Sequence, residues 1–283
     1  MRDHTRDIVL LILALIGLAI LCVKGHAQTL GLVVAKHDAF TSYYDTNTGC
    51  PALVTYELSQ RDFAGTNKVG SRRFKMDTKL PRPRVKDSDY QNTGFVRGHL
   101  CSAADRDSRK DLLKETYLTS NLVPMTMVCN SGPWRVVEEA CRSHAQQGHV
   151  LKVARGVLFK SAAAGLKNVI HAQQLKSEDR SSIIQVPAAA NKKSVVICIP
   201  DAFFCIAKCQ NCRYLESWRV CNTRRDPVEV INHVSGYHST AVCDTSQARN
   251  TYWSTYEKDI RVYQLLGNYL GSWSQEVYET IIR

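Results

Sequence analysis

The sequence predicts an α+β fold, and three stretches carry this prediction. Residues 95–100 and 116–123 are each expected to form a strand, because β-branched and apolar residues gather there between turn-forming residues. A helix is expected over residues 133–147, since Asn130 or Ser131 can cap its N-terminus and proline suits a first helical turn. The expected centre of the fold is therefore two strands followed by one helix.

The other elements follow from local composition. Residues 194–199 form a β-branched run that predicts a buried strand. Residues 161–194 are polar and alanine-rich without periodicity, which predicts a loop or insertion between two strands. The aromatic and leucine-rich residues 252–283 are expected to form a helical cap on the same core. His233 and His238 lie just before this cap and are expected to be structural.

The first residues have the features of an export signal. Two arginines precede an apolar run of 16 residues, Ile8 to Val23, and the small residues around Ala27 suit a signal peptidase. We expect cleavage after Ala27, so that residues 1–27 are a signal peptide and residues 28–283 form a single secreted domain without stable membrane association. The alternative is a membrane anchor that stays uncleaved, although a span needs about 20 residues.

The residues that carry chemistry begin with Arg97-Gly98-His99. Asn130 follows His99 by 31 residues, and Glu138 follows Asn130 by 8. A neutral histidine can take a proton from water near pH 7, and amide and carboxylate oxygens suit a hard cation such as Mg²⁺. Arg97 can present two N–H groups to a phosphate, and Gly98 is expected to form a turn. A general base, a hard cation and a guanidinium group in one site together predict the hydrolysis of phosphodiester bonds.

Separated motifs surround these residues: Asp89-Tyr90, Gly94 to Leu100, Ala103-Ala104, Tyr117 to Pro124, Asn130, Trp134 and Glu138. In this order they resemble the DNA/RNA non-specific endonuclease family, which includes mitochondrial endonuclease G and secreted bacterial and invertebrate nucleases. The resemblance covers roughly residues 44–208, in which residues 50–58, 150–159 and 199–204 look like core strands. Residues 211–283 are then a C-terminal extension or cap. The resemblance implies a ββα-metal nuclease fold with an antiparallel sheet flanked by helices.

The resemblance also implies a role for each site residue. His99 would be the general base, Asn130 the direct metal ligand, and Glu138 a second ligand or a contact of metal-bound water. Arg97 would contact the phosphate, and Asn121 would support the site. The implied reaction is hydrolysis of DNA and/or RNA to 5′-phosphate ends with Mg²⁺, or with Mn²⁺ in its place. A homodimer is an expected assembly.

Three positions depart from the usual pattern of the family. Val96 stands where many members have Asp, Cys101-Ser102 replaces a commoner Ala-Pro, and Met125 stands where Gln is usual. The alternative function is therefore a catalytically inactive protein on the same fold that binds nucleic acid or another polyanion. A hydrolase with a Ser/His triad is a poor alternative, because the sequence has no Gly-x-Ser-x-Gly motif.

The charge of the chain predicts a polyanionic partner. The formal net charge is +11, although charge alone does not separate nucleic acid from a heparin-like polysaccharide or a membrane surface. Residues 68–86 carry eight Lys and Arg against the single acid Asp77. This segment is expected to guide a phosphate backbone, with Arg73 and Arg72 as substrate contacts. The alternative is a solvated loop, which its two prolines favour.

Cysteine usage agrees with export. The sequence has 11 cysteines, and loss of Cys22 with the signal peptide leaves ten, an even set that predicts disulfides in an exported chain. The alternative is a zinc site built on Cys205, Cys209 and Cys212 with Cys221 nearby. Thiolates at such spacing suit tetrahedral zinc.

Overall fold

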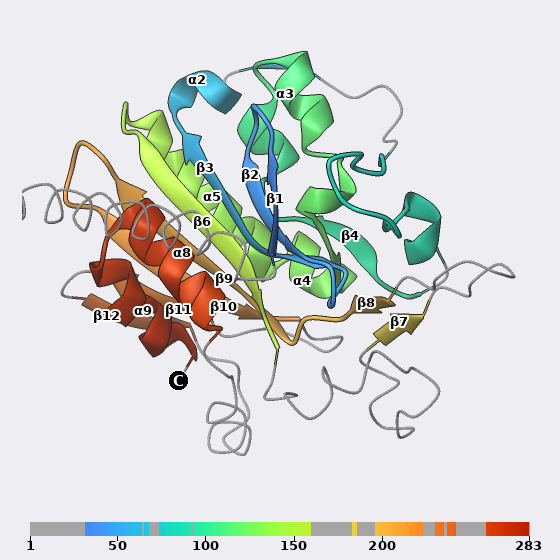
Figure 1. The fold of residues 1–283 in the computed structure, drawn as a ribbon. Helices are drawn as coiled ribbons and strands as arrows, with labels where there is room; N and C mark the ends of the chain where they lie inside the picture. The colour runs from blue at the N-terminus through green and yellow to red at the C-terminus, as the bar shows by residue number, and fades with distance from the viewer. Residues whose placement is uncertain are drawn as a thin grey trace, which may run out of the picture. The chain divides into compact units, whose positions relative to one another are not determined.

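The computed structural model describes most of the chain (Figure 1). The described residues are 32–63, 65–67, 74–91, 93–159, 183–185, 196–222, 230–234, 237–241 and 259–282. The predicted signal peptide, Arg72, Arg73 and most of residues 161–194 lie outside these ranges. Within them, no helix combines the length and the apolar character that crossing a membrane needs.

A six-stranded sheet with the order β1-β2-β3-β6-β9-β10 forms the centre of the domain. From β2 to β10, each neighbouring pair is antiparallel. The strands are β1 (Leu32–Lys36), β2 (Thr41–Asp45), β3 (Cys50–Leu58), β6 (Leu151–Leu158), β9 (Ala202–Cys209) and β10 (Leu215–Cys221). The three core strands expected from the resemblance are confirmed as β3, β6 and β9. Their long buried runs fit a sheet that is covered on both faces.

Helices cover the two faces of this sheet (Figure 1). The ring of Phe203 in β9 lies 5.5 Å from that of Trp134 in α5, and the ring of Phe204 lies 5.3 Å from that of Tyr278 in α9. Successive side chains of a strand point to opposite faces, so α5 and α9 pack on opposite sides of β9. The α+β class with an antiparallel sheet flanked by helices is thus confirmed.

The remaining elements are short helices and two-stranded sheets. The α-helices are α2 (Gln60–Phe63), α3 (Lys110–Glu115), α4 (Met127–Ser131), α5 (Pro133–Gln146), α8 (Ile260–Leu270) and α9 (Trp273–Ile282). The antiparallel pairs are β4 (Val96–His99) with β5 (Leu122–Met125), β7 (Ile183–Gln185) with β8 (Val196–Cys198), and β11 (Val230–Val234) with β12 (Tyr237–Ala241). The helical cap is confirmed in its described part, 259–282, and the strand expected at 194–199 is confirmed as β8. Residues 183–185 form β7, so the expected loop contains a strand, and His233 and His238 occupy facing positions in β11 and β12.

The turn expected at Gly98 is wrong. Gly98 is buried in the middle of β4 and pairs with Val123 of β5. A Cβ atom at this position would lie 2.7 Å from Cβ of Met125. Glycine is therefore needed here for the close approach of a side chain on the neighbouring strand, and the backbone does not turn.

The single strand expected over residues 116–123 is also wrong. Residues Thr119–Asn121 form a 3₁₀ turn, and β5 begins only at Leu122. Inside this stretch, Nδ2 of Asn121 donates a hydrogen bond of 2.8 Å to the carbonyl oxygen of Thr116. Such local side-chain bonds compete with strand pairing, which explains the shorter strand.

The expected helix over residues 133–147 is confirmed as α5, but its predicted N-cap is wrong. Asn130 and Ser131 belong to the preceding helix α4, and Gly132 lies between the two helices. The cap of α4 is Thr126, whose side chain accepts a hydrogen bond from the Cys129 N–H at 3.1 Å. The segment that carries Asn130 is therefore ordered by its own short helix.

Candidate active site

His99 is the last residue of β4 and pairs with Leu122 of β5. Its carbonyl oxygen accepts a hydrogen bond of 3.0 Å from Nε1 of Trp134, a buried residue of α5. The His99 ring meets the Tyr117 ring edge-on at 5.1 Å and lies 5.7 Å from the Phe74 ring. A strand end, a helix and two aromatic rings thus position the imidazole, as a general base requires.

Asn121 is fully buried and bonds to the backbone that follows His99. Its Oδ1 accepts from the Cys101 N–H at 2.7 Å, and its Nδ2 donates to the Cys101 carbonyl at 2.9 Å. Its own carbonyl oxygen accepts from the Leu100 N–H at 3.0 Å. These contacts shape the chain next to His99, and none of them involves the reacting face of the imidazole.

Asn130 and Glu138 lie on two consecutive helices, α4 and α5. Helix α4, which carries Asn130, packs against β4 and leads directly into α5. The Asn130 side chain is half-buried and makes no hydrogen bond to any residue that the structure describes. Glu138 lies four residues after Trp134 and shares its face of α5. The carboxylate is therefore on the face of α5 that holds the strand of His99.

A cluster of buried charges surrounds Glu138, and sequence patterns did not reveal it. Nη1 of Arg155, a fully buried residue of β6, lies 4.0 Å from Oε1 of Glu138 and 3.5 Å from Oδ2 of Asp105. The same atom donates to the Leu100 carbonyl at 3.1 Å. Nη1 of Arg142 lies 2.7 Å from Oδ1 of Asp105. Two guanidinium groups face two carboxylates, so the buried charges balance when all are ionised.

The environment of Glu138 raises its pKa to about 7. Burial is the largest cause, and the negative charge of Asp105 acts in the same direction. Arg155, Arg142 and a hydrogen bond from Ser102 lower the pKa and oppose this shift. A divalent cation beside the carboxylate would favour its charged form.

Replacing Asp105 with asparagine should destabilise the fold. Asp105 is fully buried and also accepts a hydrogen bond of 2.7 Å from the Tyr56 hydroxyl. Its loss leaves two buried guanidinium groups under-compensated, which costs about 3–5 kcal/mol of unfolding free energy. Urea unfolding measures the change. The matched control is Asp111→Asn, which breaks the exposed pair with Arg109 and should leave the transition unmoved; equal midpoints for the two variants would contradict the role of the cluster.

Arg97 is held beside the site by a carboxylate and two rings. Its Nε lies 2.5 Å from Oδ1 of Asp87, and its Nη2 donates to the Asp87 carbonyl at 2.8 Å. The guanidinium lies 5.4 Å from the centre of the Phe74 ring and 5.7 Å from that of Tyr90. The group is fixed next to the ring that contacts His99, and its expected phosphate contact stays a prediction.

The sequence model of the DNA/RNA non-specific endonuclease family matches residues 19–269. The chain belongs to this family. The match covers most of the chain and includes every site residue discussed above.

Individual relatives are more distant. The mitochondrial nuclease EXOG of Danio rerio is 30% identical over 118 residues, which are 41% of this chain and 34% of the relative. The mitochondrial nuclease EXOG of Homo sapiens is 27% identical over 141 residues, 50% of this chain and 38% of the relative. A nuclease of Syncephalastrum racemosum is 36% identical over 99 residues, 34% of this chain and 31% of the relative. The aligned part of the chain thus spans less than half the length of each relative.

Among solved structures, a chain of the EndoG/EndoGI complex aligns with a TM-score of 0.49. The sequence identity is 19%, and the alignment covers 69% of this chain and 77% of that one.

Members of the non-specific endonuclease family depend on a metal ion, and the donor set in this chain fits one. Asn130 offers an amide oxygen that no described residue engages, and Glu138 offers a carboxylate whose side chain is 15% exposed. Oxygen donors of this kind suit a hard divalent cation that keeps several of its waters.

Two departures from the family pattern face each other. Val96 and Met125 occupy opposite positions in the β4–β5 pair, and Val96 packs against the core that contains Met125. Both departures therefore belong to one pair of facing residues, in which Val and Met replace the Asp and Gln that are usual in the family. The replacement removes no group from the set formed by His99, Asn130 and Glu138.

The basic segment of residues 68–86 adjoins the site. Arg72 and Arg73 lie outside the described residues, but they directly precede Phe74, whose ring contacts His99. Asp77, the acid of the segment, is buried and pairs with His37 at 2.8 Å. It therefore does not offset the cations at the surface. The described cations of this loop are Lys75, Lys79, Arg82, Arg84 and Lys86.

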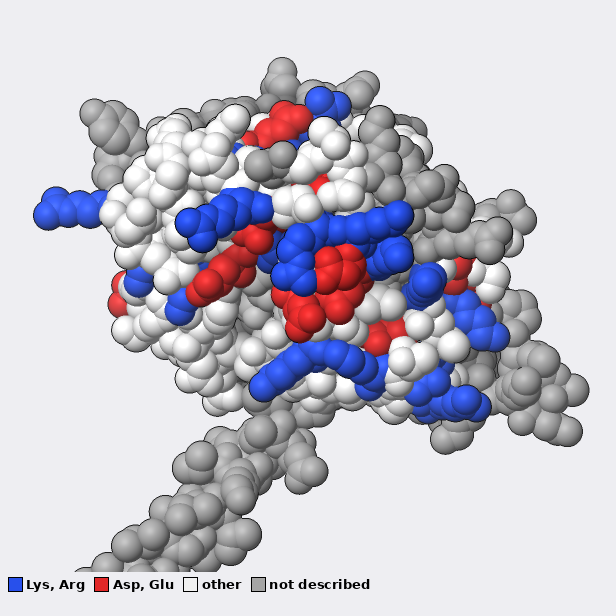
Figure 2. Space-filling view, turned by 90° about the horizontal axis from the view of Figure 1, so that it is seen from above, with Lys and Arg blue, Asp and Glu red and all other residues white. Residues whose placement is uncertain are grey.

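Another part of the surface carries both positively and negatively charged side chains. On the face seen from above the α2–α3 end, Lys and Arg surround a group of Asp and Glu (Figure 2). One exposed pair of this kind joins Arg109 and Asp111 at 2.5 Å. The positive net charge of the chain therefore does not make this face a basic one.

Of the charged residues around Glu138 that the sequence analysis did not find, one could have been recognised from the sequence. Arg155 stands in an apolar strand whose other residues are almost all buried, and a charged residue at such a position is rarely buried without a partner. Asp105 and Arg142 left no such signal, because each stands among charged residues that resemble a solvated surface.

Proposed function

We propose that the protein is a secreted, metal-dependent endonuclease that hydrolyses phosphodiester bonds of DNA and/or RNA. The observation that carries the proposal is the link between β4 and α5, in which Trp134 holds the backbone of His99 from the face that also bears Glu138. In the proposal, the two strands and the helix bring a base and oxygen donors to one site. Membership of the non-specific endonuclease family supports the same reaction class.

In this proposal His99 takes a proton from the attacking water. The neutral imidazole is the active form. The aromatic rings of Tyr117 and Phe74 contact it and restrict its orientation. Asn130 and Glu138 would hold Mg²⁺, or Mn²⁺ in its place, which stabilises negative charge in phosphodiester hydrolysis. Asn121 shapes the backbone after His99.

Substrate binding is assigned to the basic segment and to Arg97. The segment reaches the site at Phe74, so cations at Arg72 and Arg73 are near enough in sequence to meet a phosphate next to His99. Contacts of this kind neutralise backbone charge without reading bases, which makes binding salt-sensitive and independent of sequence.

A cleavage assay tests the activity. The purified full chain is incubated with supercoiled plasmid DNA and with RNA, in Mg²⁺ and in EDTA. We expect nicking of plasmid and degradation of RNA in Mg²⁺, and neither in EDTA. Salt-sensitive binding without cleavage in either Mg²⁺ or Mn²⁺ would instead establish the inactive nucleic-acid-binding protein.

Export rests on the N-terminal pattern and is supported by the even cysteine set that remains after cleavage. Expression in eukaryotic cells should release a chain that begins near Gln28, and intact mass measures this. Recovery of the full chain from the membrane fraction would support the uncleaved anchor. Import into mitochondria, the location named for the EXOG relatives, would overturn secretion. The expected homodimer stays a prediction that gel filtration of the same preparation checks.

A further inference from the structure

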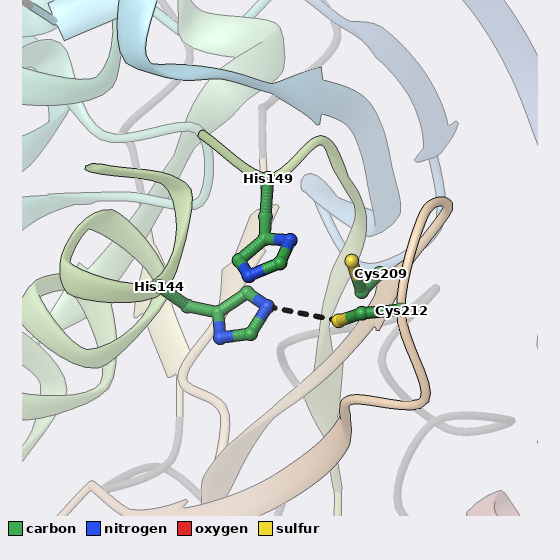
Figure 3. Close-up of side chains that lie close together, drawn as sticks. All are labelled: His144, His149, Cys209 and Cys212. Carbon is green, nitrogen blue, oxygen red and sulfur yellow. Dashed lines mark hydrogen bonds between the residues drawn. The ribbon is translucent and has the colours of Figure 1, made fainter. Parts of the chain in front are cut away.

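Two histidines and two cysteines from distant parts of the chain meet at one end of the sheet (Figure 3). His144 lies in the last turn of α5, and His149 precedes β6. Cys209 ends β9, and Cys212 lies in the turn between β9 and β10. One ring nitrogen of each histidine and the two sulfur atoms all lie within 4.8 Å of one another.

One distance in the group already matches that between two ligand atoms of a metal centre, and ring stacking orders the histidines. Nε2 of His144 lies 3.4 Å from Sγ of Cys212. The two imidazole rings stack at 4.3 Å, and the His144 ring also stacks on Tyr214 at 3.7 Å. Around tetrahedral zinc, bonds of about 2.3 Å to sulfur and about 2.0 Å to nitrogen would separate the ligand atoms by roughly 3.3 to 3.8 Å. Small side-chain movements therefore close the set around one ion.

The spacing of the four residues matches structural zinc sites. The cysteines have the form Cys-x₂-Cys and the histidines the form His-x₄-His, which both fall within the ranges common in Cys₂His₂ sites. The cysteine turn is ordered by hydrogen bonds: the Tyr214 N–H donates to Sγ of Cys212 at 3.4 Å, and the Cys209 N–H donates to the Tyr214 carbonyl at 2.9 Å. An N–H donor to sulfur favours a thiolate.

A bound ion would satisfy one buried atom of the group, and a second contact is compatible with it. Nδ1 of His149 is buried and has no hydrogen-bond partner among the described residues, and such an atom is costly to leave unsatisfied. Sγ of Cys209 lies 3.1 Å from Oδ1 of Asn211, which also accepts from the Val150 N–H at 3.1 Å. Asn211 therefore keeps a partner when the Cys209 thiol loses its proton to bind a metal.

We propose that His144, His149, Cys209 and Cys212 bind one structural zinc ion. Four protein ligands leave no open position for substrate, so the ion has a structural role. It fastens the C-terminal end of α5 to the β9–β10 turn. Glu138 lies six residues before His144, about 9 Å along the helix axis, so the ion anchors the helix that carries part of the candidate active site.

This set differs from the one that cysteine spacing suggested. Cys209 and Cys212 are common to both, but Cys205 and Cys221 do not belong to the group that the structure brings together. Sγ of Cys205 instead accepts a hydrogen bond of 3.5 Å from Nε of Arg155. Nine cysteines of the predicted mature chain are described, and they are thiols in the structure. The tenth, Cys243, lies outside the described residues. The disulfides expected of the set of ten stay a prediction.

Metal analysis of the full chain, expressed with added zinc and then separated from free metal, tests the proposal. We expect about one zinc ion per wild-type chain, as in other four-ligand sites, and loss of zinc in His149→Ala and in Cys212→Ser. Cys129→Ser, which removes a buried thiol outside the set, should retain it. Asn130→Ala should retain it as well, so a failure of this proposal is distinguishable from a failure of the proposed nuclease activity.

Cobalt replacement provides a second measurement if the variants do not fold. Wild-type protein and Asn130→Ala reconstituted with Co²⁺ should show the strong visible absorption of a tetrahedral thiolate site. Zinc-free wild-type protein with free Cys209 and Cys212, or a disulfide between these two residues in the mass spectrum, would overturn the proposal. Equal zinc content in wild type, His149→Ala and Cys212→Ser would overturn it too.

Discussion

Replacing His99 with alanine is expected to lower the cleavage rate by about 10²- to 10⁴-fold, the usual contribution of a general base. The affinity for DNA should change by only a few-fold, because the imidazole acts in the transition state and not in ground-state binding. The rate is measured on plasmid DNA in Mg²⁺, and the affinity is measured in EDTA, where no cleavage competes.

Two controls accompany this variant. The hydrogen bond from Trp134 goes to the backbone of His99, so the alanine variant keeps this link, and its thermal unfolding should remain close to that of the wild type. Free imidazole should restore part of the activity of His99→Ala, since a diffusible base can occupy the vacated space. Cleavage by the variant at near wild-type rate would show that another group accepts the proton.

The second large effect is expected for Asn130→Ala. Metal stabilisation of charge in the transition state contributes several kcal/mol, and a loss of about 3 kcal/mol corresponds to a rate reduction of roughly 150-fold. Activity is measured across a Mg²⁺ titration. Ser131→Ala is the matched control, because it removes a neighbouring exposed hydroxyl whose hydrogen bond among the described residues goes to the Met127 carbonyl; its activity should equal that of the wild type.

The response to Mg²⁺ distinguishes the two candidate ligands. Glu138→Gln keeps the shape of the side chain and removes its charge, so it should be impaired less than Asn130→Ala and partly rescued by more Mg²⁺. Full activity of wild-type protein in excess EDTA, or of Asn130→Ala at low Mg²⁺, would rule out this metal site.

Several parts of the fold could be predicted from sequence because the signal is local. The apolar run Cys50–Leu58 is typical of a buried strand, and the structure has a strand there. Proline is typical of a first helical turn, and helix α5 begins at Pro133. The family, too, was evident from motifs in a particular order. Element boundaries were less predictable, since Gly98 acts through a contact with Met125 on the neighbouring strand and Asn121 bonds to the backbone of Cys101.

The sequence by itself determined the family, the main strands, helix α5 and the candidate triad His99, Asn130 and Glu138. Only the tertiary structure decided which charges meet around Glu138, and which histidines join Cys209 and Cys212. The physical reason is sequence distance: periodicity and capping report burial and local bonding, whereas charge pairing and metal coordination depend on packing between segments far apart in the chain. Arg155 and Asp105, 50 residues apart, become neighbours only when the 3₁₀ turn of residues 103–106 packs near β6.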